Sequence, residues 1–301
     1  MSLKLRMARL YRCMLTRISP KLNTMVVYHS KFGRKLDLEH PVTLNEKNLW
    51  LKFNTYWNNP LIKECADKYL VRKYVERAGC SKILNELITS YDSPEKIDWD
   101  KLPDRYAIKL NIGSGYNLIV SDKNKLNRVE AEKRIASWFK KAPKCYLGYS
   151  EMQYKDVKPV IIVEKYLGGP NGELPEDYKF YCINGRCEMI MLCKDRQYDG
   201  HGAKYFYYDR EWNQITNGLN DPSLTAERPV NLEAAIQYAE ILSKPFPYVR
   251  VDLYLIGDLI YFGELTFTPA AGMDVDHKLK PFGCDEDLDH IYGRILKLPN
   301  K

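Results

Sequence analysis

Residues 248–272, with the sequence YVRVDLYLIGDLIYFGELTFTPAAG, constrain the fold of this chain more than any other segment. Residues 249–256 and 259–267 are runs of mainly β-branched, aliphatic and aromatic residues, and the turn residues Gly257 and Asp258 separate them. Two such runs around a two-residue turn with glycine are typical of a β-hairpin. The sequence therefore predicts a pair of antiparallel strands here.

Each run also carries two polar residues two positions apart, Arg250 and Asp252 in the first and Glu264 and Thr266 in the second. Side chains at this spacing lie on the same face of a strand. Because the turn folds one run back on the other, we expect the two polar pairs to meet at the open end of the sheet.

Two carboxylates in one place predict a metal site. Asp252 and Glu264 would repel each other unless a cation lay between them. Mg²⁺ suits this position because it prefers carboxylate and phosphate oxygens and keeps some of its waters. The Thr266 hydroxyl can bind the ion or order one of its waters. The alternative is an exposed hairpin whose charges are solvated.

The remaining sequence alternates between helical and strand patterns. Apolar residues recur at helical spacing between residues 40 and 80, where Thr43 and Glu46 form a capping-box pattern. Two further helices are predicted at residues 130–141 and 231–242. Strand patterns cover residues 106–110, 118–120, 160–163, 177–183 and 186–192, and Asn184-Gly185 predicts a hairpin between the last two. This mixture predicts an α+β protein.

A second candidate site follows the strand pattern at 106–110. Lys109 lies at the end of this strand, and Gly113, Ser114 and Gly115 form a loop of small residues after it. An ammonium group and backbone N–H groups in such a loop can surround phosphate oxygens, since glycine allows close approach. The alternative is an ordinary β-turn.

A third candidate site follows residues 160–163, where a buried strand runs directly into Glu164, Lys165, Tyr166 and Leu167. This pattern is typical of a hinge between two lobes. Extended backbone at a hinge can form hydrogen bonds with the edge of an adenine ring, and apolar neighbours can sandwich the ring. The alternative is a strand that leaves the core into a turn.

In this order along the chain, the three segments resemble the ATP-grasp superfamily, and in particular its TupA-like branch, which is associated with polysaccharide and teichuronopeptide biosynthesis. The resemblance extends over residues 35–285 and includes PVTLNEK at 41–47, ADKYLVR at 66–72, AIK at 107–109, IVEKY at 162–166, DYKF at 177–180, RVD at 250–252 and FGELTF at 262–267. It implies an ATP-grasp fold, in which two α+β lobes clasp ATP. The implied parts are a mainly helical N-terminal region with a basic arm (1–104), a small lobe with the phosphate loop (105–167) and a large lobe with the metal site (168–301).

The resemblance also implies which residues hold the nucleotide. Lys109 would reach the phosphates, the loop of Gly113, Ser114 and Gly115 would close over them, and Arg72 would add a second cation. The remaining implied contacts are adenine with Glu164, Lys165, Tyr166 and Leu167, the ribose hydroxyls with Asp177, and the nucleotide with Lys179.

For the chemistry, the resemblance implies that Asp252, Glu264 and Thr266 hold Mg²⁺ against the phosphates. Arg250 would stabilise charge on the reacting groups, and Arg196 or Lys204 would contact the γ-phosphate. The superfamily usually has Glu-x-Asn on the second metal strand, whereas this chain has Glu264-Leu265-Thr266. The number of metal ions is therefore left open.

The implied activity is that of an ATP- and Mg²⁺-dependent carboxylate–amine ligase that acts through an acyl phosphate. A phosphorylated carboxylate is a far better electrophile than a free one. The implied substrates are a uronic-acid carboxyl group of a cell-surface polysaccharide or its precursor, and an amino acid or small amine. Two alternatives remain. One is a glycosyltransferase, in which Asp274 and Asp276 would hold a metal–nucleotide-sugar, and the other is a non-catalytic ATP-binding scaffold at a membrane.

The positive charge of the chain is concentrated at its N-terminal end. Residues 1–36 contain nine of the 46 Lys and Arg residues and none of the 39 Asp and Glu residues. Apolar residues alternate with these cations, which is typical of a helix on an anionic membrane surface or of a helix docked on the body with a basic outer face. No nucleic-acid-binding motif accompanies the charge, so we expect no nucleic-acid partner. Without a secretory signal or membrane span, the expected location is the cytoplasm, peripheral to the inner membrane face if the helix binds lipid.

Overall fold

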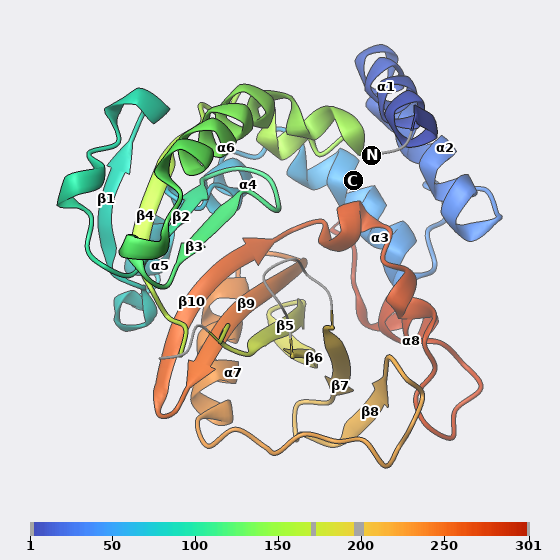
Figure 1. Ribbon diagram of the computed structural model, residues 1–301. Coiled ribbons are helices and arrows are strands. Elements are labelled where there is room, and N and C mark those ends of the chain that lie inside the picture. Colours follow the sequence, from blue (N-terminus) through green and yellow to red (C-terminus); the bar gives the residue numbers. More distant parts are fainter. Residues whose placement is uncertain (1–2, 170–172, 196–201, 300–301) are drawn as a thin grey trace.

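The computed structural model describes residues 3–169, 173–195 and 202–299 (Figure 1). Two antiparallel sheets form the framework of this part of the chain. The small sheet has the strand order β1-β4-β2-β3, and the large sheet has the order β10-β9-β5-β6-β7-β8. The bounds of the strands are β1 Leu87–Tyr91, β2 Tyr106–Leu110, β3 Asn117–Val120, β4 Ile161–Lys165, β5 Asp177–Ile183, β6 Arg186–Lys194, β7 Lys204–Tyr208, β8 Gln214–Asn217, β9 Tyr248–Ile256 and β10 Leu259–Thr266.

Helices cover the sheets and form the N-terminal part of the chain. Their bounds are α1 Leu3–Ile18, α2 Pro20–Phe32, α3 Leu44–Leu51, α4 Pro60–Ala66, α5 Val71–Arg77, α6 Arg128–Lys141, α7 Leu232–Ser243 and α8 Leu288–Ile295, and a π-helical turn, Lys52–Tyr56, follows α3. Among the described helices, none is both long enough and apolar enough to cross a membrane.

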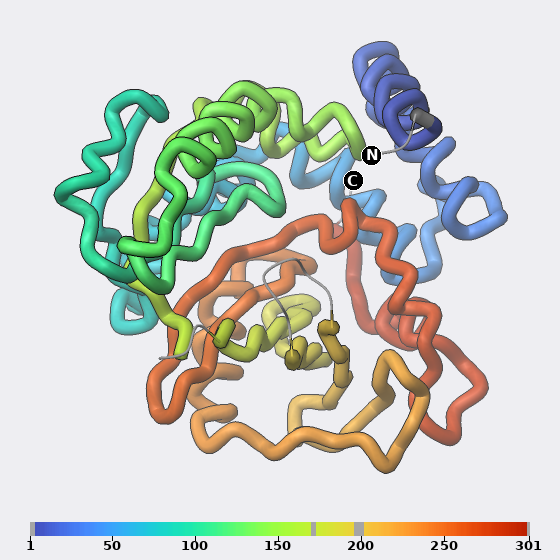
Figure 2. Tube along the Cα trace, viewed as in Figure 1, coloured from blue at the N-terminus to red at the C-terminus, as the bar shows by residue number. Residues whose placement is uncertain are grey.

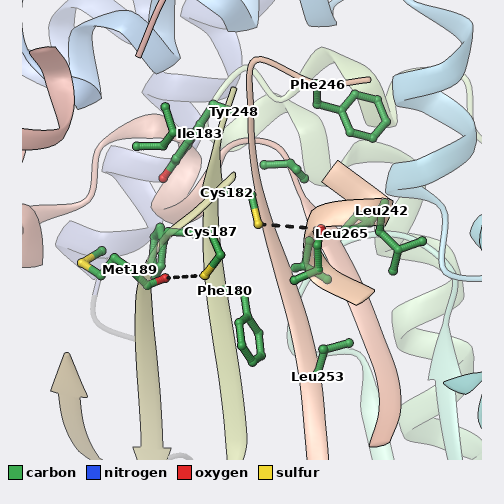
Figure 3. Close-up of a cluster of buried hydrophobic side chains, with 14 of the residues drawn as sticks. Phe180, Cys182, Ile183, Cys187, Met189, Leu242, Phe246, Tyr248, Leu253 and Leu265 are labelled. Carbon is green, nitrogen blue, oxygen red and sulfur yellow. Dashed lines mark hydrogen bonds between the residues drawn. The ribbon is translucent and has the colours of Figure 1, made fainter. Parts of the chain in front are cut away.

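The large sheet is buried on the face that α7 covers (Figure 3). Leu232, Ala235, Ile236, Ala239 and Leu242 are buried at the spacing of one helical stripe. Beneath them, alternate residues of the strands point toward the helix, so Figure 3 shows Phe180, Cys182 and Leu253 in the same cluster as Leu242. The residues between these alternate positions must point to the opposite face, which is the face of interest.

The hydrophobic cores join parts of the chain that are distant in sequence. Residues of α3, α4 and α5 share the core of the large sheet, including Leu44, Ile62 and Val75. A second core lies between α6 and the small sheet and includes Ile108, Ile135 and Val163. Strand β1 pairs with β4 of the small sheet, although it falls inside the predicted helical region 1–104. The division at residues 104 and 167 remains a prediction.

Most predicted elements are confirmed within two residues of their predicted bounds. Strands β2 and β5 coincide with the predicted runs, and the helices predicted at 130–141 and 231–242 are α6 and α7. Thr43 and Glu46 form the predicted capping box at the start of α3. Asn184 and Gly185 have φ angles of 52° and 79°, as a tight hairpin turn of this type requires.

Candidate functional site

The polar pairs of the β9–β10 hairpin meet on one face of the large sheet. Glu264 lies opposite Asp252, and Thr266 lies opposite Arg250. Strand β5 adds Lys179, which lies opposite Asp252 on its other side. Three neighbouring strands of the large sheet therefore carry one polar cluster on the face away from α7.

A bulge in β10 produces this alignment. The regular pairing ends at Phe262, which lies opposite Leu253, and resumes at Glu264, so that Gly263 is an extra residue in the strand. Without the bulge, Glu264 would lie opposite Val251, which is fully buried on the α7 side. A Cβ atom on Gly263 would lie 2.8 Å from the carbonyl oxygen of Asp252, so the bulge has room only for glycine.

Asp252 is held by two cations. The Arg250 guanidinium donates from Nε to Asp252 Oδ1 and from Nη2 to Oδ2, at 2.7 Å each. Lys179 Nζ donates to Asp252 Oδ2 at 2.9 Å and also contacts Asp177. Asp252 is only 4% exposed, so these contacts compensate a carboxylate that is almost completely removed from water.

Glu264 is held by a cation from outside the sheet. Lys68, between α4 and α5, places Nζ 3.0 Å from Glu264 Oε2. Arg250 Nη2 lies 3.7 Å from Glu264 Oε1, and the Thr266 hydroxyl donates to the same oxygen at 3.2 Å. Burial raises the pKa of Glu264, but the charges of Lys68, Arg250 and Lys179 outweigh burial and lower it to about 2.

The same lysine links the hairpin to the predicted phosphate loop. Lys68 Nζ donates a hydrogen bond to the Gly113 carbonyl at 2.9 Å. Gly113 has a φ of +77°, which favours glycine. Sequence reasoning assigned Lys68 no role, although the stretch ADKYLVR at 66–72 contributed to the resemblance.

On the small sheet, Lys109 and Arg72 share one carboxylate. Lys109 Nζ lies 2.8 Å from Glu164 Oε2, and Arg72 Nη1 lies 3.4 Å from Glu164 Oε1. Arg72 also donates to the Asn85 carbonyl at 2.7 Å. Burial lowers the pKa of Lys109, but the charge of Glu164 outweighs it and raises that pKa. The Glu164 carboxylate therefore keeps two cations in place, and contact of Glu164 with adenine remains a prediction.

A pocket of about 690 Å³ lies between the small sheet, the segment after β4 and β9. Its lining includes six residues predicted to bind nucleotide, namely Lys109, Ser114, Gly115, Lys165, Tyr166 and Leu167. It also includes Asn85, Arg134 and Tyr254, which sequence reasoning missed because they come from three separate elements without a shared motif. The volume and the mixed polar and apolar lining fit a nucleotide.

Beyond Thr266, a further polar group connects the hairpin to residues 151–153. The Thr268 hydroxyl donates to Glu151 Oε1 at 3.0 Å and accepts from Gln153 Nε2 at 3.1 Å. Burial raises the pKa of the Glu151 carboxyl. Nearby, Lys52 Nζ donates to the carbonyls of Tyr149 and Ala271 at 2.6 and 3.3 Å, and burial lowers the pKa of Lys52 to about 8.

The backbone next to this group is strained. Ala270 and Ala271 have φ angles of 48° and 63°, in the region that non-glycine residues rarely occupy. Strain of this kind persists where the surrounding structure enforces it, and it is common at functional sites. Neither Glu151 nor this turn was predicted, because both depend on contacts across the fold.

Four other predicted residues do not contact this cluster or fall outside the described residues, namely Arg196, Lys204, Asp274 and Asp276. Lys204 pairs with the exposed Asp195 at 2.8 Å, and Arg196 is outside the described residues. The alternative metal pair is engaged in local structure, since Asp274 caps the backbone N–H of Asp276 at 3.1 Å and Asp276 accepts from the Tyr207 hydroxyl at 3.2 Å.

The described residues contain no group of three or more His, Cys, Asp or Glu side chains arranged for a metal ion. The hairpin offers two facing carboxylates and one hydroxyl, all oxygen donors. This set fits Mg²⁺, which takes one or two carboxylates and completes its shell with phosphate oxygens and water.

The family described as TupA-like ATPgrasp matches residues 46–289. No curated protein matches the chain.

Similar solved structures include the D-alanine–D-alanine ligase of Bacillus anthracis, with 20% identity over 70% of this chain and 59% of that one and a TM-score of 0.43. The corresponding ligase of Helicobacter pylori shows 13% identity over 77% and 61% of the chains, with a TM-score of 0.44. An N5-carboxyaminoimidazole ribonucleotide synthetase, purK, shows 13% identity over 82% and 56%, with a TM-score of 0.41. The chain thus spans about three-fifths of the length of these proteins.

The family match covers more than half of the chain and includes the predicted phosphate loop, the predicted hinge and the β9–β10 hairpin. It confirms the predicted α+β fold class. The chain belongs to the TupA-like ATP-grasp family and has the ATP-grasp fold.

Proposed function

We propose that the protein is an ATP- and Mg²⁺-dependent ligase that joins a carboxylate to an amine. The observation that carries this proposal is the facing pair Asp252 and Glu264 on the large sheet, which Lys68 links to the loop beside Lys109. Carboxylates on one lobe and cations on the other can bind Mg²⁺ and the phosphates of ATP together.

The reaction has two balanced steps. A carboxylate oxygen of the substrate attacks the γ-phosphorus of ATP, the bond to the β-phosphate oxygen breaks, and ADP leaves. The amine nitrogen then attacks the acyl carbon, the bond to phosphate breaks, and the nitrogen loses a proton as the amide forms. Such transfers need positioning and neutralised charge more than a protein nucleophile.

Each charged group of this site has a place in that scheme. Lys109 and Lys68 neutralise phosphate oxygens, while Arg250 lies beside Asp252 and stabilises the charge that develops on the reacting acyl group. Mg²⁺, when bound by Asp252, Glu264 and Thr266, supplies further charge neutralisation at the phosphates. Lys165, Tyr166 and Leu167 line the pocket, where they would position the nucleotide base.

We further propose that the carboxylate belongs to a uronic acid of a polysaccharide or its precursor, that the amine is an amino acid or small amine, and that the enzyme works in the cytoplasm. Membership of the TupA-like family supports the substrate class.

The test is release of ADP and phosphate from Mg·ATP in the presence of glucuronic-acid oligosaccharides and a panel of amino acids. Turnover should require both substrates. Nucleoside diphosphate released from a sugar donor without ATP would instead identify a glycosyltransferase, and ATP binding without turnover for any pair would identify a scaffold.

Removal of either carboxylate should abolish this turnover. We expect Asp252→Asn and Glu264→Gln to lower kcat at least about a hundredfold, since each removes a charge that the transition state requires. Asp285→Asn, at an exposed aspartate outside the site, is the matched control. Undiminished turnover in both site variants would refute the metal assignment.

A further inference from the structure

The helix α1 is docked on the body along one side only. Leu15 and Thr16 are buried, and the Thr16 hydroxyl donates to the Leu147 carbonyl at 2.8 Å. Asn23 of α2 donates to the same hydroxyl at 2.9 Å. The sequence left open whether this helix packs on the body or contacts a membrane, and these contacts show that it packs on the body.

The opposite side of α1 is apolar and exposed. We name it the outer stripe, which consists of Met7, Leu10, Tyr11, Met14 and Ile18. These side chains are 51–74% exposed. Their spacing of three or four residues places them in one row along the helix, about half a turn away from Thr16. Packing on the body therefore leaves each side chain of this row at least half exposed.

Cations border the outer stripe. Arg6 and Arg17 lie along one edge and Lys4 lies along the other, given 3.6 residues per turn. All three are exposed, and residues 1–36 contain no acidic residue that could neutralise them. In α2, Leu22, Met25 and Val26 are also exposed, at 37–42%. Figure 2 shows both helices at the edge of the molecule.

We propose that the outer stripe binds the surface of a membrane that contains anionic lipids, with α1 lying in the plane of the interface. Apolar side chains can enter the acyl boundary while the flanking cations contact lipid phosphates. A second copy of the chain fits less well, because a two-fold contact would bring two fully cationic segments together. This proposal is independent of the ligase activity.

The test is co-sedimentation of the full chain with vesicles of phosphatidylcholine, with or without phosphatidylglycerol. We expect binding to the mixed vesicles that weakens as salt is added. Leu10→Glu/Met14→Glu should weaken this binding at least about tenfold, because the substitutions place anions in the apolar row. Leu219→Glu/Val230→Glu is the matched control, since these two side chains are 63% and 77% exposed elsewhere.

All three proteins should have equal melting temperatures and equal ATP affinities, because the outer stripe contacts neither the core nor the pocket. Absence of binding of the wild type to mixed vesicles would overturn the proposal, as would equal binding by the stripe variant. Oligomerisation that the stripe variant abolishes, without vesicle binding, would overturn it in favour of a second copy.

Discussion

At the scale of single residues, the cluster on the large sheet uses protein cations where a metal ion is expected. Lys68 contacts Glu264, and Arg250 and Lys179 contact Asp252. Burial raises the pKa of the Asp252 carboxyl, whereas the neighbouring cations lower the pKa of Glu264. A metal ion that binds here must share these carboxylates with the cations or displace the cations. We therefore expect Mg²⁺ to bind more tightly together with ATP, whose phosphate oxygens supply further ligands, than alone.

The lowered pKa of Glu264 predicts a pH-dependent contribution to stability. Without metal and ATP, Glu264→Gln should lower the free energy of unfolding by about 1 kcal/mol at neutral pH. The value is modest because an ion pair that water can reach stabilises the folded state only slightly. The stabilisation is fully present above the ordinary pKa of 4.5 and is lost as the pH falls toward about 2.

Urea unfolding at a series of pH values measures this effect. The difference between wild type and variant should be constant above pH 4.5 and shrink below it. Glu227→Gln, at an exposed glutamate outside the cluster, should show no such change. A difference that persists undiminished at the acid end would contradict the charge assignment.

At the scale of elements, the bulge in β10 decides which side chains reach the site. It twists the strand and places Glu264 and Thr266 on the same face as Asp252. Gly263→Ala should destabilise the fold by about 1–3 kcal/mol, because the new Cβ atom collides with backbone. Gly148→Ala is the control, since a Cβ atom there meets nothing within 4 Å.

Denaturant unfolding measures the free energy of unfolding, and the rise in melting temperature on addition of Mg·ATP measures binding of the nucleotide. We expect Gly263→Ala to reduce both, because the strand carries the carboxylate. A variant as stable as Gly148→Ala would show that the bulge can relax around a side chain.

The hairpin also shows what sequence reasoning can and cannot reach. Alternation and the Gly257 turn predicted the two strands and the polar pair on each strand, because both depend on local residue order. The pairing of Glu264 with Asp252 could not be predicted, because it depends on the bulge at Gly263. Regular pairing from the two-residue turn would place Glu264 opposite Val251. Glu151 and the pairing of Glu164 with Lys109 were out of reach, because these contacts join residues from different elements.

At the scale of the whole molecule, Lys68 connects the loop after β2 with the large sheet. It donates to Gly113 in that loop and pairs with Glu264 on β10. Lys68→Met removes both contacts and should weaken Mg·ATP binding about tenfold, the worth of one charged hydrogen bond. Calorimetric titration measures the affinity, with Lys73→Met on the exposed side of α5 as control. Equal affinity in the two variants would exclude a role for Lys68 at the nucleotide.

The extra residue in β10 has a consequence for how this chain can change in length. Deletion of Gly263 would join Phe262 directly to Glu264, and the existing partners Leu253 and Asp252 would then continue an unbroken ladder. The polar side chains would keep their face. Substitution by a large residue such as valine would instead force the strand away from Asp252. Position 263 should therefore tolerate deletion of the residue better than substitution by a larger one. We expect relatives of this chain to have glycine or a one-residue gap there.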